Sequence, residues 1–164
     1  MTTRNANHMI KRSCQWREPT WQTNIMNSEK EILIDKSKDI ENRNDIETVL
    51  VSFYQKAFAD ELIGRFFTEV VPLDLATHLP VITDFWETVI LNKQVYRKNV
   101  MQIHQHIHQL SSIKKEHLDR WVEIFTITIG EHFTGEKASL MKQRAASIAT
   151  LMDIKLNHDL INKT

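Results

Sequence analysis

The chain is poor in the residues that break helices or cross-link small domains. Its 164 residues include three Gly, three Pro and one Cys. Soluble proteins contain on average about 7 % Gly and 5 % Pro, so this scarcity argues against a β protein with many turns and favours long helices. The single cysteine, Cys14, excludes an internal disulfide and argues against a zinc ribbon. We therefore expect a reducing, cytoplasmic setting.

The chain also lacks an excess of either charge and any long apolar run. Lys and Arg together number 21 and so do Asp and Glu, which excludes a global attraction to nucleic acid or to an anionic membrane. No apolar run reaches the roughly 18 residues of a membrane span. Neither a GxSxG motif nor a cluster of glycines is present, so a serine hydrolase and a phosphate-binding loop are not indicated.

The first 38 residues differ from the rest of the chain. Four basic residues precede the first acid, Glu18, and no apolar stretch typical of a signal peptide follows them. We expect residues 1–38 to be a poorly ordered N-terminal extension and residues 39–164 to form the folded domain. A transit peptide, and a natural start at Met26, remain alternative interpretations of this segment.

From about residue 39, apolar residues recur at helical spacing and predict an all-α domain. Asn44 and Glu47 resemble a capping box that begins the first helix, which ends within residues 60–67. Later helices are predicted over 75–91, with Pro80 near the first turn, over 113–133 and over 136–156, and residues 101–110 are expected to form a short helix or a turn. Ser111 and Ser112 are candidate caps for the fourth helix, and Gly135 is expected to end it in a left-handed conformation. The buried face of the first helix is expected to comprise Ile46, Val49, Leu50, Phe53 and Ala57.

Histidine is abundant, with eight residues, and three of them form an HxHxH run at His104, His106 and His108. On a helix His104 and His108 share a face, and a pair with this spacing can bind zinc. A zinc site would need a further ligand such as His117 or a carboxylate. Solvent-exposed histidines are the simpler interpretation of His106, His108 and His117.

Three polar side chains occur beside the apolar faces of three different predicted helices. They are the phenol of Tyr54, the imidazole of His78 and the indole of Trp121. Each needs a polar partner when buried, and a few polar groups directed into an apolar cavity are typical of a ligand pocket. Phe66 and Phe67 are candidate walls of such a pocket.

The order of these motifs is familiar. The chain contains FY at 53–54, DELIGRFF at 60–67, HLP at 78–80, FW at 85–86, HLDRW at 117–121 and FTGEK at 133–137. Over about residues 39–157 this series resembles the group III truncated haemoglobins. The resemblance implies a shortened globin fold, with helices packed two over two around one b-type haem.

The resemblance also implies roles on the proximal side of the haem. The family's iron-ligating histidine matches His104, and Val100 stands where the family usually has Pro. Loss of that Pro loosens the entry to the helix but leaves the imidazole in place. His106 and His108 remain alternative iron ligands. Candidate partners for the haem propionates lie just before this helix: Tyr96, Arg97 and Lys98.

On the distal side, the family's hydrogen-bond donors to the bound ligand match Tyr54 and Trp121. His78 matches the position that faces or gates the ligand. The apolar and aromatic lining of the pocket matches Phe67, Ile82, Phe85 and Trp86.

The resemblance thus implies a haem-binding globin that reversibly binds oxygen and other diatomic ligands. Peroxidase-like or nitric oxide dioxygenase-like turnover, the latter with a reductase partner, remains open. So does a resting state in which His78 and His104 both ligate iron. The rival interpretation is a haem-free helical interaction module or a histidine-metal protein.

Overall fold

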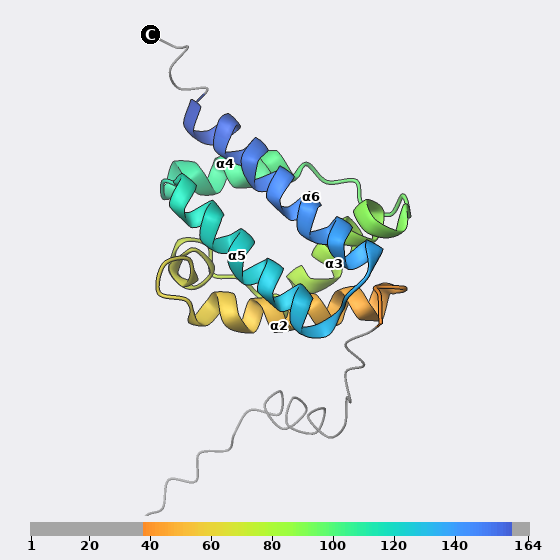
Figure 1. Ribbon diagram of the computed structural model, residues 1–164. Coiled ribbons are helices and arrows are strands. Elements are labelled where there is room, and N and C mark those ends of the chain that lie inside the picture. The colour runs from red at the N-terminus through yellow and green to blue at the C-terminus, as the bar shows by residue number, and fades with distance from the viewer. Residues whose placement is uncertain (1–37, 159–164) are drawn as a thin grey trace, which may run out of the picture. The chain divides into compact units, whose positions relative to one another are not determined.

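The computed structural model describes residues 38–158, and every regular element in that range is helical (Figure 1). The expected N-terminal extension therefore lies, apart from Lys38, outside the described residues. None of the helices described is long and apolar enough to cross a membrane. The prediction of an all-α domain is confirmed. In chain order the elements are α2 (Arg43–Ala59), the π-helical turn η1 (Phe66–Val70), α3 (Leu75–Leu91), α4 (Val100–Leu110), α5 (Lys115–His132), α6 (Glu136–Asp153) and the π-helical turn η2 (Ile154–His158).

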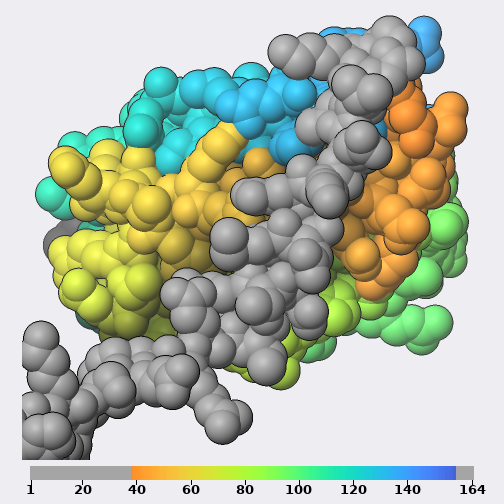
Figure 2. Space-filling view, turned by 90° about the horizontal axis from the view of Figure 1, so that it is seen from below, coloured from red at the N-terminus to blue at the C-terminus, as the bar shows by residue number. Residues whose placement is uncertain are grey.

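The four long helices form two pairs. Helix α2 packs against α3, and α5 packs along α6; the pairs meet where α2 contacts α5 and where α3 contacts α6. In Figure 1 the short helix α4 lies on the side of the view opposite to α2. Figure 2, seen from below, shows α2 in orange to yellow along one outer face, next to the segment that leads into α3. The inner side of α2 is therefore directed at the other long helices.

The main core lies between the two helix pairs and is rich in aromatic rings. All five residues predicted for the buried face of α2 are at most 1 % exposed, so that prediction is confirmed. Phe125 of α5 stacks on Trp86 of α3 at a centroid distance of 5.0 Å and on Trp121 at 5.1 Å. Phe53 of α2 meets Phe125 edge-on at 5.1 Å. Offset and edge-to-face geometries of this kind are the favoured ones for aromatic pairs.

A second cluster of buried residues, called here the α4 support cluster, comprises Ile113, Leu118, Ala149, Met152 and Leu156. Three residues of α4, which are Val100, Met101 and Ile107, pack against it while remaining partly exposed. No residue of α4 is itself fully buried. The position of α4 therefore depends on this small cluster rather than on the main core.

The first helix begins two residues earlier than predicted. Asn42, not Asn44, is the N-cap: its side chain accepts the N–H groups of Asn44 and Asp45 at 2.9 and 3.2 Å. The Asp45 carboxylate accepts the Asn42 N–H in return, at 3.1 Å, which completes a capping box. Glu47 instead pairs with Arg43 one turn away, which explains why its spacing to Asn44 was misleading.

Helix α3 has the predicted bounds, but Pro80 is its sixth residue and lies beyond the first turn. Proline inside a helix removes a hydrogen bond and costs about 3 kcal/mol. Two effects offset this cost. The Asp74 side chain caps the helix by accepting the Ala76 N–H at 3.1 Å, and Trp86 and Ile90 are 1 % and 4 % exposed. Burying a large apolar side chain contributes roughly 1.5–3 kcal/mol.

The predicted boundaries around α5 and α6 need correction. Ser111 is the C-cap of α4, and Lys114 precedes α5. Gly135 is not a left-handed stop: with φ 128° and ψ −171° it is the N-cap of α6. A Cβ at this position would lie 2.5 Å from Cγ of Asp39, so glycine permits the close approach of that carboxylate. Helix α6 ends at Asp153, before the predicted residue 156.

The N-terminus of α6 is capped by Asp39, a residue near the start of the described sequence. The two carboxylate oxygens of Asp39 accept the N–H groups of Lys137 and Ala138, each at 2.9 Å. Burial raises the pKa of Asp39, but these bonds and one from the Ile40 N–H outweigh it and hold the pKa below its ordinary value. The carboxylate is also favoured by the positive end of the helix dipole.

Replacing Asp39 by alanine is expected to lower the free energy of unfolding by about 1–2 kcal/mol, the usual value of a helix cap. Because the pKa is lower in the folded state, the carboxylate contributes stability above its unfolded pKa, and this contribution is lost as the pH falls through the folded value. Urea unfolding at neutral and acidic pH measures both effects. Asp119→Ala, which removes an exposed carboxylate on α5, is the control; equal losses for the two variants would contradict the capping role.

Candidate functional site

Tyr54 and His78 meet where α2 passes the first turn of α3. The Tyr54 hydroxyl is hydrogen-bonded to Nε2 of His78 at 2.7 Å, and the two rings are perpendicular at 5.5 Å. Tyr54 is 6 % exposed, and burial raises the pKa of its phenol. Burial, and then the nearby His104 and Lys98, lower the pKa of His78. Near neutral pH the pair is therefore an uncharged phenol bonded to an uncharged imidazole.

His104 lies on α4 with one ring nitrogen already occupied. Its Nδ1 is 2.9 Å from the carbonyl oxygen of Val100, four residues earlier on the helix. A carbonyl can only accept, so Nδ1 carries the proton and Nε2 keeps a free lone pair. Burial lowers the pKa of His104, although the bond to Val100 raises it. A neutral imidazole with a free Nε2 is the form that binds a metal ion.

His104, on α4, is near enough to His78, on α3, to add to the effect of burial in lowering the pKa of His78. Phe67 lies beside Tyr54, at a ring distance of 5.9 Å. Phe85 meets Tyr96 edge-on at 5.3 Å, and Ile82 is half-buried against the main core. Phe67 thus lies beside the Tyr54–His78 pair, while Phe85 and Tyr96 form a separate aromatic contact.

Two predicted pocket residues belong mainly to the aromatic core. Trp86 is 1 % exposed and stacks on Phe125. Trp121 is partly buried between Phe125 and Phe53, and its indole N–H makes no hydrogen bond within residues 38–158. Phe53 also meets Tyr54 edge-on at 5.1 Å, so Trp121 and Tyr54 pack on the same ring. The indole N–H is therefore an unused donor on the α5 side of this cluster.

The loop before α4 places cations beside the site. Tyr96 is half-buried, and its backbone N–H donates to the Thr88 hydroxyl at 3.1 Å. Arg97 and Lys98 are exposed and form no ion pair with any described residue. Lys98 is near enough to His78 to lower its pKa. Lys98 is therefore available to an anionic group near His78, and Arg97 precedes it in the chain.

The other histidines of the HxHxH run have different surroundings. His106 is exposed, and Nδ1 of His108 accepts the backbone N–H of Ile113 at 3.1 Å. Within residues 38–158 there is no group of three His, Cys, Asp or Glu side chains that could hold a metal ion. The carbonyl partner of His104 could not be identified from the sequence, although residues four apart on a helix are neighbours.

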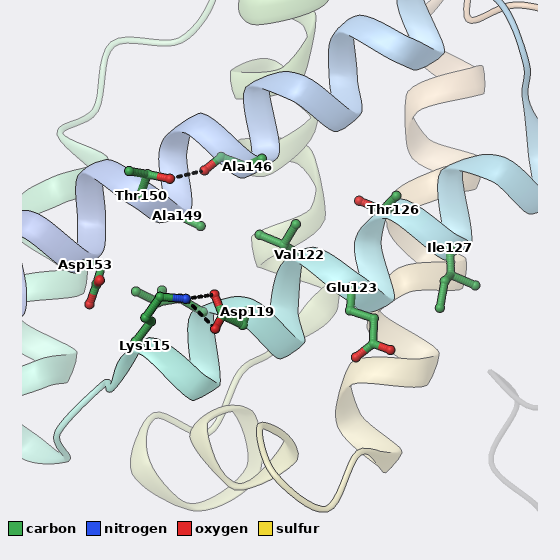
Figure 3. A pocket seen from close by; sticks show the side chains of 11 residues that line it. Lys115, Asp119, Val122, Glu123, Thr126, Ile127, Ala146, Ala149, Thr150 and Asp153 are labelled. Atoms are coloured by element: carbon green, nitrogen blue, oxygen red, sulfur yellow. Dashed lines mark hydrogen bonds and ion pairs between the residues drawn. The ribbon is translucent and has the colours of Figure 1, made fainter.

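A separate groove lies on the outer side of α5 and α6 (Figure 3). Its volume is about 490 Å³, and the Lys115–Asp119 ion pair stands near one end, opposite Asp153. No predicted site residue lines it. The groove and the Tyr54–His78–His104 cluster are therefore distinct features.

Comparison with known proteins indicates which fold this is. No family model and no curated protein matches the sequence. Among solved structures, the crystal structure of a group III truncated hemoglobin from Campylobacter jejuni is similar, with a TM-score of 0.64 and 22 % sequence identity. The match covers 73 % of this chain and 94 % of that one. At this identity the likeness establishes the fold alone: the chain has the truncated globin fold, as its ordered motifs predicted.

Proposed function

We propose that the protein binds one b-type haem through His104 and reversibly binds oxygen and other diatomic ligands on the opposite side. The observation that carries this proposal is the neutral, Nδ1-protonated imidazole of His104 placed near the Tyr54–His78 pair. A proximal histidine is the usual iron ligand of a globin. Its tautomer is the one required for ligation through Nε2.

The surrounding residues fit a haem. Phe67, Ile82 and Phe85 supply an apolar and aromatic lining, which suits a porphyrin. Lys98 and Arg97 supply cations for the propionates, with the Tyr96 hydroxyl as a further candidate. When bound, haem supplies an iron centre that takes up diatomic ligands. Trp86 meets the lining residue Phe85 edge-on at 5.3 Å and would support it from the aromatic core, where it stacks on Phe125.

On the distal side, the chain offers donors to a ligand that carries partial negative charge. The Tyr54 phenol is buried and stays protonated at neutral pH, so it can donate. The Trp121 N–H has no other partner within the described residues. The Tyr54 hydroxyl is bonded to Nε2 of His78, and in the tautomer in which Nε2 accepts, a ligand must share or displace that bond. His78 therefore controls how freely Tyr54 can donate.

His78 would be a second histidine available to hold the haem iron at rest, beside His104. Its Nε2 would then have to leave the Tyr54 hydroxyl, since it cannot serve both. Turnover of peroxide or nitric oxide would use the same polar residues, and nitric oxide turnover would also require a reductase partner. Spectra of the ferric and ferrous forms at rest distinguish six-coordinate from five-coordinate iron.

The visible spectrum of the purified protein tests the proposed function. We expect a coloured protein with a Soret band that shifts on reduction and again on addition of carbon monoxide. Haem added to apoprotein should bind in a one-to-one ratio. A colourless protein that does not take up added haem would support the rival interpretation, a haem-free helical interaction module.

A further inference from the structure

The short loop between α4 and α5 is held by two histidines, one from each helix. Nδ1 of His108 accepts the backbone N–H of Ile113 at 3.1 Å. Nδ1 of His117 accepts the backbone N–H of the next residue, Lys114, at 3.0 Å. A backbone N–H can only donate, so both ring nitrogens must be unprotonated. We call these two bonds the histidine clamp.

The clamp acts where α4 has little other support. Ile113 is 7 % exposed and belongs to the α4 support cluster, against which Val100, Met101 and Ile107 pack. Because no residue of α4 is fully buried, the orientation of that helix depends on where Ile113 and its neighbours are held. His104 is carried by α4, and its Nδ1 bond also runs to an α4 carbonyl.

We propose that His108 and His117 are positioning residues that fix the α4–α5 loop and thereby orient His104, and that they do so only while their imidazoles are neutral. The link to His104 rests on the proposed function; the clamp itself does not. Neither histidine is required to touch the haem. This gives a use to two histidines that the sequence analysis interpreted as solvent-exposed.

The chemistry of imidazole makes the clamp sensitive to pH. Protonation places a hydrogen on Nδ1, which then faces an N–H group and can no longer accept. Burial, Lys114 and Arg65 lower the pKa of His117, while Glu116, 3.9 Å from Nε2, raises it; the Phe66 ring at 4.9 Å is the remaining close neighbour. The pKa is lowered on balance, so the clamp bond is present above it and is lost as the pH falls through it.

His108 holds the loop by the same kind of bond. It lies in the last turn of α4, and its Nδ1 accepts the Ile113 N–H. A hydrogen on Nδ1 would remove the acceptor, and the bond to the loop backbone would be lost with it.

Asparagine offers a matched replacement that does not titrate. In α2, Asp45 is the third helical residue and its side-chain oxygen accepts the N–H of the N-cap, Asn42, at 3.1 Å. His117 has the same relation to Lys114 in α5. The doubly substituted His108→Asn/His117→Asn protein should therefore keep the clamp, and the His108→Leu/His117→Leu protein should lose it. His106→Asn, an exposed position on α4, is the control.

The first measurement is amide hydrogen exchange at Ile113 and Lys114 in the full chain, corrected for intrinsic rates. In the unsubstituted protein, protection should fall by about tenfold between about pH 7.5 and pH 5, the range in which histidine titrates. The asparagine protein should keep its protection over this range. The leucine protein should lack that protection already at about pH 7.5.

The second measurement is the rate of haem transfer from each protein to an excess of apomyoglobin. The leucine protein should lose haem about tenfold faster than the unsubstituted protein at neutral pH, if two ordinary hydrogen bonds are lost. The asparagine and His106→Asn proteins should lose it at the unsubstituted rate. The acid-induced acceleration should be smaller in the asparagine protein than in the control.

Amide exchange tests the histidine clamp itself, and haem transfer tests its role in orienting His104. Protection that depends on pH equally in the asparagine and unsubstituted proteins would overturn the clamp, as would full protection in the leucine protein. A clamp seen by exchange, combined with equal haem transfer in all variants, would overturn its role in orienting His104. Failure of every protein to bind haem would contradict the proposed function and leave the exchange result to decide the clamp.

Discussion

Replacing His104 by glycine is expected to abolish stable haem binding. The substitution removes the only imidazole in the described residues whose Nδ1 is bonded to the carbonyl four residues earlier on α4 and whose Nε2 is therefore free near the Tyr54–His78 pair. Loss of an outer partner of a metal ligand already costs 10–100-fold in affinity, so loss of the ligand itself should exceed about 100-fold. Haem transfer to apomyoglobin and the visible spectrum measure the effect.

Two controls make this result specific. His106→Gly introduces the same helix-weakening residue two positions away on α4, at an exposed site, and should retain haem. Free imidazole should restore the spectrum of the His104→Gly protein, since it can occupy the space left by the side chain. Haem loss in the His106 variant, with retention in the His104 variant, would show that the proximal ligand has been misassigned.

Replacing Tyr54 by phenylalanine is expected to speed oxygen dissociation by about 10- to 100-fold, which corresponds to a hydrogen bond of about 1.4–2.8 kcal/mol. Phenylalanine preserves the ring contacts with Phe53, Phe58 and Phe67 and removes only the hydroxyl. Because burial raises the pKa of the phenol, the donor stays protonated and the effect should persist across neutral pH. Stopped-flow measurement of oxygen release tests the prediction.

The control is Thr48→Val, which deletes a hydroxyl elsewhere on α2, where it donates to the Asn44 carbonyl. Its oxygen dissociation rate should equal that of the unsubstituted protein. An unchanged rate in Tyr54→Phe would remove Tyr54 from the residues that contact the ligand. His78→Leu tests whether His78 and bound oxygen compete for the Tyr54 hydroxyl. Because this substitution frees the hydroxyl, oxygen dissociation should become slower if they compete.

Part of the candidate site left a signal in the sequence. Tyr54 follows Phe53 on the buried face of α2, where apolar spacing places it. His78, in the first turn of α3, was singled out by its resemblance to a family position, and the fold shows that it meets Tyr54. The spacing of the histidines on α4 was not enough. His104 and His108 share a face, and only the fold shows that His108 is bonded to the loop backbone and His104 to its own helix.

The bonds that cap the helices are of two kinds, local and long-range. Asp74 and Asn99 cap α3 and α4 from within two or three residues, and such local bonds leave a local signal in the sequence. The cap of α6 left no local signal in the sequence, because Asp39 lies about a hundred residues before the N–H groups that it accepts. Gly135 was consequently assigned to a helix end when its role is to admit that carboxylate.

The sequence by itself determined that the chain is helical, which faces of its helices are apolar, and which types of polar side chain adjoin them, because periodicity and short-range hydrogen bonding operate within a few residues. Only the tertiary structure decided which of those side chains meet. Trp86 joined the aromatic core by stacking on Phe125, and Trp121 and Tyr54 came to share the ring of Phe53. Such contacts depend on how whole helices pack, and helix packing is a property of all the buried surfaces together.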